Sequence, residues 1–157
     1  MMNPLSVLLI EDNPADADLT REAFESNRQD VDLSVVLDGV DALDFLHQRE
    51  GFSDATEPDL VLLDLNLPRK SGREVLAEIK RSDRLRQIPV VVLSSSRDGE
   101  DVRQSYDLGA NSYISKPVDF HSFRIALSSL KRFWFSTVQL PSGKKRRLPF
   151  DGTGDAD

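Results

Sequence analysis

The sequence predicts an α/β fold, a doubly wound five-stranded parallel sheet with helices on both faces. Short apolar runs without a polar interruption, such as residues 60–63 and 90–93, suit strands that are buried on both faces. A stretch with helical spacing of apolar residues follows each such run, which gives five successive βα units. Strict alternation of strand and helix favours a parallel sheet, because each crossover must return to the same edge with the same hand.

The first two units occupy the amino-terminal part of the chain. Residues 7–10 are a strand candidate that ends at Glu11 and Asp12. Asn13 followed by Pro14 then matches the start of a helix, with Asn as its cap. The apolar positions of this helix are Leu19, Ala23 and Phe24, and those of the helix after a second strand at residues 33–37 are Val40, Leu43 and Leu46.

The other three units follow a polar loop at residues 51–58. The strand at residues 60–63 ends at Asp64, and Ser71 with Glu74 matches a capping box that opens the next helix. The later elements are a strand at residues 89–93 that runs into Ser94, a helix with Val102 and Tyr106 closed by Gly109, a short strand at residues 112–114, and a helix capped by Asp119 whose Phe123, Leu127, Leu130 and Trp134 share a face.

Length and composition exclude several classes of function. The 157 residues fit one ordinary domain, and the absence of cysteine removes thiol catalysis, thiolate metal sites and disulfides, in agreement with a reducing cytoplasm. The start of the chain lacks the features of a signal peptide, and no run approaches membrane-spanning length. A net charge of −7 opposes general binding to nucleic acid. We therefore expect a cytoplasmic protein that binds neither membrane nor nucleic acid.

Five polar side chains fall at the carboxyl ends of the predicted strands: Glu11, Asp12, Asp64, Ser94 and Lys116. In a parallel sheet these ends meet at one edge, where ligands bind. Three neighbouring carboxylates repel one another unless a cation lies between them, and their oxygens suit magnesium (Mg²⁺), with Mn²⁺ as an alternative. Each residue alone also has an ordinary explanation as a turn residue or helix cap. Their joint placement favours a site that handles a phosphoryl group.

This set of residues, in this order over roughly the first five-sixths of the chain, resembles the receiver domain of two-component response regulators. The motifs are Glu11-Asp12, Asp64 within Asp-Leu-Asn-Leu-Pro, Ser94, and Lys116-Pro117. The resemblance implies a flavodoxin-like, CheY-like fold in which Asp64 is the phosphoacceptor for a histidine kinase. It also implies that Asp12 and Asp64 hold Mg²⁺ directly, Glu11 through water, and Asn66 through its backbone carbonyl.

The same resemblance assigns the parts of a conformational switch. Ser94 and Lys116 would contact the phosphoryl group, and Tyr113 would turn inward as the switch aromatic. The face formed by the fourth helix, the fifth strand and the fifth helix would carry the signal to partners. In the family the bond between Lys116 and Pro117 is usually cis, which would aim the lysine.

Three consecutive aromatic residues, Phe133, Trp134 and Phe135, are more than one helix face can bury. Two explanations stay open. Residues 136–140 fold back over the aromatic side chains, or these side chains contact a second copy of the chain. Because aromatic residues are enriched in interfaces, we expect a homodimer through this region.

We expect a stand-alone receiver domain at residues 1–135, followed by a partly disordered extension at residues 136–157 whose basic run, residues 144–147, is solvated. The pattern of residues 105–114 and the aromatic end resemble the small response regulators of bacterial phytochrome-type histidine kinases. That resemblance implies such a sensor kinase as phosphodonor. The sequence does not identify the downstream protein.

Two other functions stay open. A magnesium-dependent aspartyl phosphatase also uses an aspartate on a parallel sheet, but such enzymes carry a second aspartate two residues later, where this chain has Asn66. A receiver-like interaction module that never takes phosphate usually lacks the acceptor, an acidic partner or the lysine, and all are present here. We therefore expect autophosphorylation and autodephosphorylation chemistry only, not an enzyme that turns over a substrate.

Overall fold

The computed structural model describes residues 4–25 and 31–142 and contains a five-stranded, all-parallel sheet with strand order β2-β1-β3-β4-β5. The strands are β1 (Leu5–Ile10), β2 (Val31–Val36), β3 (Leu60–Leu63), β4 (Val90–Ser94) and β5 (Ser112–Ser115). The helices are α1 (Pro14–Phe24), α2 (Gly39–Leu46), α3 (Gly72–Arg81), α4 (Gly99–Asp107), α5 (Phe120–Arg132) and a π-helix, η1 (Phe133–Thr137). The predicted fold class and the five βα units are confirmed.

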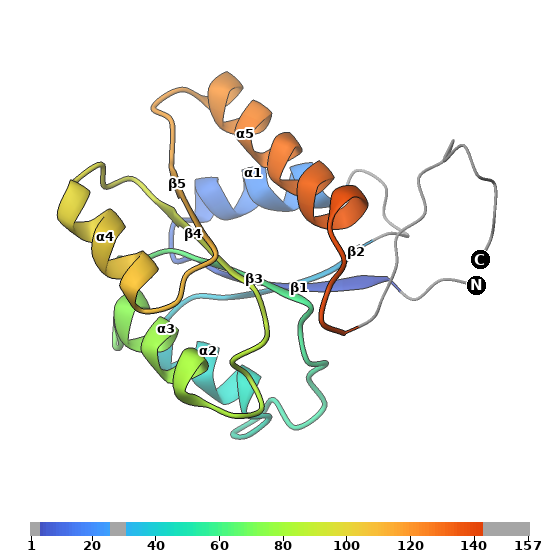
Figure 1. Cartoon of the computed structure of the whole chain (residues 1–157). Coiled ribbons are helices and arrows are strands. Elements are labelled where there is room, and N and C mark those ends of the chain that lie inside the picture. The colour runs from blue at the N-terminus through green and yellow to red at the C-terminus, as the bar shows by residue number, and fades with distance from the viewer. Residues whose placement is uncertain (1–3, 26–30, 143–157) are drawn as a thin grey trace.

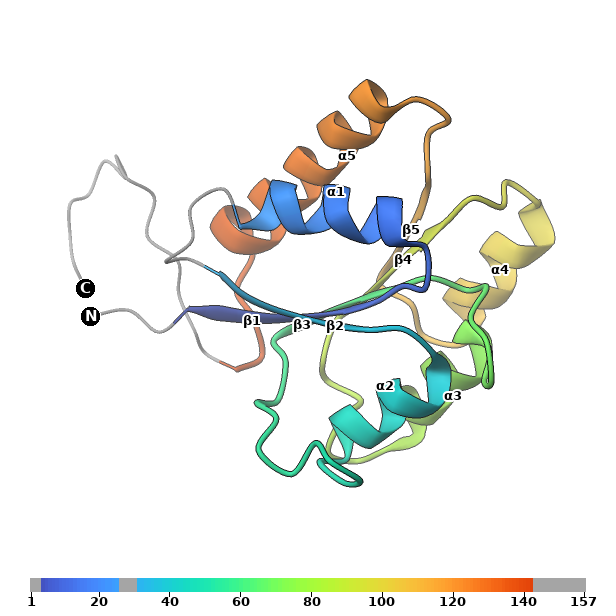
Figure 2. The ribbon, with the colours of Figure 1, turned by 180° about the vertical axis from the view of Figure 1, so that it is seen from behind.

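Helices cover both faces of the sheet. Helices α1 and α5 lie together on one face, and α2 and α3 lie on the other, with α4 beyond α3 at the β5 edge (Figures 1 and 2). Each face has its own apolar core, and successive residues of one strand contribute to opposite cores: Val7 and Leu9 face α1 and α5, whereas Leu8 and Ile10 face α2 and α3. This alternation explains why the central strand β3 is apolar at every position.

The helix starts follow the caps that the sequence predicts. The Asn13 side chain accepts a hydrogen bond from the Asp16 amide, and Ser71 and Glu74 form both hydrogen bonds of the capping box. Asp119 likewise accepts from the Ser122 amide at the start of α5. These caps fix the starts of α1, α3 and α5, which follow the carboxyl ends of β1, β3 and β5, where the predicted site lies.

The carboxyl-terminal end of α5 differs from the prediction. Phe123, Leu127 and Leu130 are buried as expected, but the next core position is taken by Phe135, and Trp134 is only half-buried. The reason is the π-helix: the Phe133 carbonyl accepts from the Val138 amide five residues later, at 3.2 Å, which adds one residue to the turn. Phe135 then meets the ring of Phe24 edge-on, with 5.7 Å between centroids.

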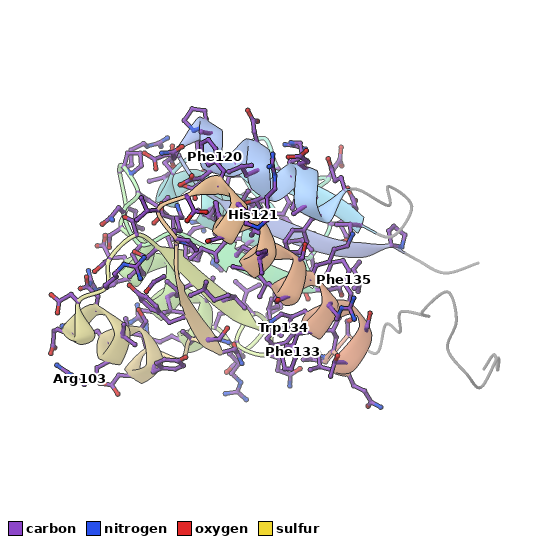
Figure 3. The ribbon with its side chains drawn as sticks, turned by 90° about the horizontal axis from the view of Figure 1, so that it is seen from above. Arg103, Phe120, His121, Phe133, Trp134 and Phe135 are labelled. Atoms are coloured by element: carbon purple, nitrogen blue, oxygen red, sulfur yellow. The ribbon has the colours of Figure 1, made fainter. Side chains whose placement is uncertain are left out.

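The π-helix also changes the prediction for the aromatic cluster. Phe135 is 6% exposed within its own core, so its assignment as a dimer contact is wrong. Leu140 is buried and Val138 packs against the same core, as expected if the chain folds back over this end of α5. Phe133 is 48% exposed (Figure 3) and is available to a partner. The predicted basic run at residues 144–147 lies outside the described residues.

Among the described residues, no helix has both the length and the apolar content needed to span a membrane.

Candidate functional site

Strand register brings the predicted site residues to one edge of the sheet. Ile10 pairs with Leu63, so Glu11 and Asp64 follow neighbouring strand ends, and the Asp64 amide donates to the Ile10 carbonyl at 3.0 Å. On the other side of β3, β4 ends at Ser94, whose carbonyl accepts from the Lys116 amide at 2.8 Å. Residues separated by more than a hundred positions in the sequence therefore meet because of the strand order.

Glu11, Asp12 and Asp64 form a cluster of carboxylates whose potential ligand atoms all lie within 4.8 Å of one another. Glu11 and Asp64 are buried, whereas Asp12 is exposed at the mouth of the site. This donor set fits a hard divalent cation, because it consists of oxygen atoms only and leaves a side open for water and a further oxygen ligand. The three carboxylates that the sequence predicts as metal ligands are thus brought together.

The Lys116 ammonium lies on the inner side of this cluster. Its Nζ atom lies 2.6 Å from Glu11 Oε1, 2.9 Å from Asp16 Oδ2 and 3.4 Å from Asp64 Oδ2. Asp16 is a partner that the sequence analysis did not predict. It lies in the first turn of α1, and that turn lies over the end of β1 because only Asn13 and two acidic residues separate them.

The pKa values of Glu11 and Lys116 are both raised, but for different physical reasons. Burial raises the pKa of Glu11 to about 7, and its hydrogen bond with Asp64 adds to the rise, while Lys116 opposes it. Burial alone would lower the pKa of Lys116, but its hydrogen bonds with Glu11 and Asp16 outweigh that effect and raise it above its ordinary value. Lys116 is therefore a permanent cation in a site with excess negative charge.

The chain after Asp64 turns back closely over the site. The Asn66 amide donates to Asp64 Oδ1 at 3.2 Å, which orients the carboxylate. Gly72 makes this turn possible: a Cβ atom at this position would lie 2.3 Å from the Asp64 carbonyl oxygen. No described contact involves the Asn66 carbonyl, so its role as a metal ligand stays a prediction.

Comparison with known proteins identifies the family. Residues 7–128 match the response regulator receiver domain. The chain belongs to this family. Response regulator Rcp1 of Synechocystis is 42% identical over 139 residues, which cover 88% of this chain and 95% of Rcp1.

Two solved structures share the receiver fold closely. The phosphorylated cyanobacterial phytochrome response regulator RcpA matches with a TM-score of 0.86 and 43% identity, over 88% of this chain and 99% of the RcpA chain. The Mn²⁺-bound form of Rcp1 matches with a TM-score of 0.85 and 42% identity, over 88% of this chain and 99% of that chain. The residues of this receiver's site lie within the segment 7–128 that matches the family.

The residues that the sequence analysis predicts as a switch, Ser94 and Tyr113, meet at Ser96, which it did not identify. The Ser96 amide donates to the buried Ser94 hydroxyl at 3.2 Å, and the Ser96 carbonyl accepts from the Tyr113 hydroxyl at 2.9 Å. Through its own hydroxyl, Ser96 donates to Asp101 of α4, and Asp101 pairs with Arg73 of α3. One residue thus links the predicted phosphoryl contact, the switch aromatic and helix α4.

The side chain of Tyr113 is half-buried and packs against the core on the α2 and α3 face. It therefore already points inward, which is the orientation that the sequence analysis assigns to the signalling form. The Lys116–Pro117 bond is trans, as are all described peptide bonds, so the implied cis bond is absent. Trans is the commoner geometry for a bond before proline.

Proposed function

We propose that this receiver accepts a phosphoryl group on Asp64 from a phosphohistidine of a sensor histidine kinase. The observation that carries the proposal is the position of the Asp64 carboxylate within the acidic cluster and 3.4 Å from Lys116 Nζ. An Asp64 oxygen attacks phosphorus as the phosphorus–nitrogen bond of the donor breaks, and the imidazole nitrogen keeps the electron pair. The product is an acyl phosphate on Asp64 and an unphosphorylated histidine.

A divalent cation, Mg²⁺ or Mn²⁺, would offset the charge that the incoming phosphoryl group adds. Asp12 and Asp64 would bind it through their side chains, Glu11 through water, and Asn66 through its carbonyl. The oxygen-only donor set supports this assignment. The Mn²⁺-bound form of the similar protein Rcp1 supports it as well.

Lys116 would pair with a phosphoryl oxygen, and the Ser94 hydroxyl would donate to another. Because the Ser96 amide is bound to the Ser94 hydroxyl, a movement of Ser94 would be transmitted to Ser96 and from there to Tyr113 and Asp101. The surface of α4, β5 and α5 would then present the signal. Phosphorylation would shift an existing equilibrium between the resting and signalling conformations, since Tyr113 already lies inward without a phosphoryl group.

The partners are proposed from the relatives. Three of the similar structures are phytochrome or bacteriophytochrome response regulators by description, which supports a phytochrome-type kinase as the phosphodonor. We propose that the protein acts in the cytoplasm. The exposed ring of Phe133 supports a homodimer through α5 and η1. The chain would signal to a downstream protein by docking, with no turnover of a substrate, and Asn66 in place of a second aspartate supports this over a phosphatase.

The test is phosphorylation by acetyl phosphate, with and without Mg²⁺, read by intact mass. The wild type is expected to gain one phosphoryl group only with the cation, and Asp64→Asn is expected to gain none. Asp83→Asn is the matched control, because Asp83 has 97% of its side chain exposed and lies outside the site. Absence of any gain in the wild type would refute the proposal and favour the interaction module.

A further inference from the structure

Lys116 has three donor hydrogens and three carboxylate partners, so its capacity to donate is already filled. A phosphoryl group on Asp64 can take the donor hydrogen that the Asp64 carboxylate releases, but it gains a second hydrogen bond from Lys116 only if Glu11 or Asp16 yields one. Asp64 itself becomes the acyl phosphate. The competition for the ammonium is then between the phosphoryl group and two carboxylates, those of Glu11 and Asp16.

Of these two competitors, Asp16 is held in place without the help of Lys116. Its amide donates to Asn13 Oδ1 at 3.0 Å, and its carbonyl accepts from the Thr20 hydroxyl at 2.8 Å, so the backbone at Asp16 is fixed in α1. A carboxylate in the first turn of a helix is also favoured by the helix dipole. Asp16 thus carries a negative charge beside Lys116 on a fixed backbone, outside the cluster of Glu11, Asp12 and Asp64.

We propose that Asp16 is a positioning residue that withholds Lys116 from the phosphoryl group and, in doing so, sets the balance between cation binding and phosphoryl acceptance. This inference rests on the proposed function of Asp64. A fixed carboxylate near the cluster attracts a divalent cation. The same carboxylate competes with the phosphoryl group for Lys116 and repels its negative charge. Its removal should therefore move the two binding events in opposite directions.

The test compares Asp16→Asn with Asp18→Asn. Asp18 lies on the same helix, is exposed, and makes no ion pair within the described residues, so its variant removes the same charge away from Lys116. Calorimetric titration with Mn²⁺ measures the dissociation constant of the cation. Intact mass at saturating Mg²⁺ measures the acetyl phosphate concentration that gives half-maximal phosphorylation.

For Asp16→Asn we expect the dissociation constant for Mn²⁺ to rise about three- to tenfold. The acetyl phosphate concentration for half-maximal phosphorylation should fall by about threefold or more, because Lys116 is released to the phosphoryl group. Asp18→Asn should change neither value by more than about twofold. Asp16→Glu keeps the charge and should restore both values toward those of the wild type.

Loss of both cation and phosphoryl binding in Asp16→Asn would mean that Asp16 only supports the structure, and would overturn the inference. Equal effects of Asp16→Asn and Asp18→Asn would also overturn it, because net charge would then be the cause. Asp16→Ser removes the charge with a different side chain and should shift both values in the same directions as Asp16→Asn. If the wild type accepts a phosphoryl group and the Asp16 variants behave like the wild type, only this inference fails. If the wild type accepts no phosphoryl group, the proposed function fails as well.

Discussion

Replacement of Phe135 by alanine is expected to destabilise the receiver far more than the same replacement of Phe133. The two residues lie two positions apart in the sequence, and both belong to the π-helix η1 (Figure 3). Phe135 is buried against α1, where its ring meets Phe24 edge-on, whereas Phe133 has 48% of its surface exposed. Comparison of the two variants therefore tests the π-helical turn, which the sequence did not predict.

The expected magnitude follows from burial. Truncation of a fully buried phenylalanine to alanine typically costs about 3–5 kcal/mol, and Phe135 is 6% exposed, so its loss should fall in this range. A domain of this kind has about 5–15 kcal/mol of stability in total, so the variant would lose a large fraction of it. Phe133 keeps much of its ring in water and touches Trp134, so its truncation should cost about 1 kcal/mol or less.

Urea unfolding followed by far-ultraviolet circular dichroism measures both changes at one protein concentration. Sedimentation velocity on the same samples measures the oligomeric state, and Phe133→Ala should shift a homodimer toward monomer while leaving the fold intact. Phe135→Ala should lower the free energy of unfolding instead. A loss below about 1 kcal/mol for Phe135→Ala, or equal losses for both variants, would refute the π-helical register.

Two further predictions concern the site. In metal-free buffer, Glu11 keeps its proton in the folded state up to a pKa of about 7 but loses it near 4.5 when unfolded, so the free energy of unfolding should fall by up to about 3 kcal/mol as the pH rises through this window. Glu11→Gln should lack this slope in urea unfolding at a series of pH values; an unchanged slope would contradict the assignment. Gly72→Ala places a Cβ atom 2.3 Å from the Asp64 carbonyl oxygen and should cost about 1–3 kcal/mol and reduce phosphorylation by acetyl phosphate. Gly99→Ala, whose Cβ meets only the end of Arg103 at 3.4 Å, is the control and should stay close to the wild type in both assays.

The fold was predictable because its signals are local. The apolar run of β3 predicts a strand, and the Asn13-Pro14 pair predicts the start of α1, and neither prediction depends on the rest of the chain. Once strands and helices alternate, the handedness of the crossovers leaves few topologies. Glu11, Asp64 and Lys116 could therefore be placed at one edge of the sheet before any distance was known.

The parts that escaped prediction depend on spacing in three dimensions. Asp16 pairs with Lys116 because the α1 turn lies over the end of β1, and Ser96 joins Ser94 to Tyr113 through backbone atoms that have no sequence signature. The π-helix depends on which carbonyl accepts from Val138. The position of Asp16, four residues after Asp12, could have drawn attention to it. Residue type alone, however, does not distinguish an aspartate that interacts with the helix dipole from one that forms an ion pair.

The charges of the site imply that cation binding and phosphoryl acceptance are coupled. Four carboxylates, those of Glu11, Asp12, Asp16 and Asp64, face the single ammonium of Lys116. When all are ionised, three negative charges remain uncompensated, and a phosphoryl group would add more. A divalent cation lowers that cost, and by reciprocity the phosphoryl group must tighten cation binding by the same factor. Lys116 cannot supply this compensation alone, because it carries one positive charge against four carboxylates.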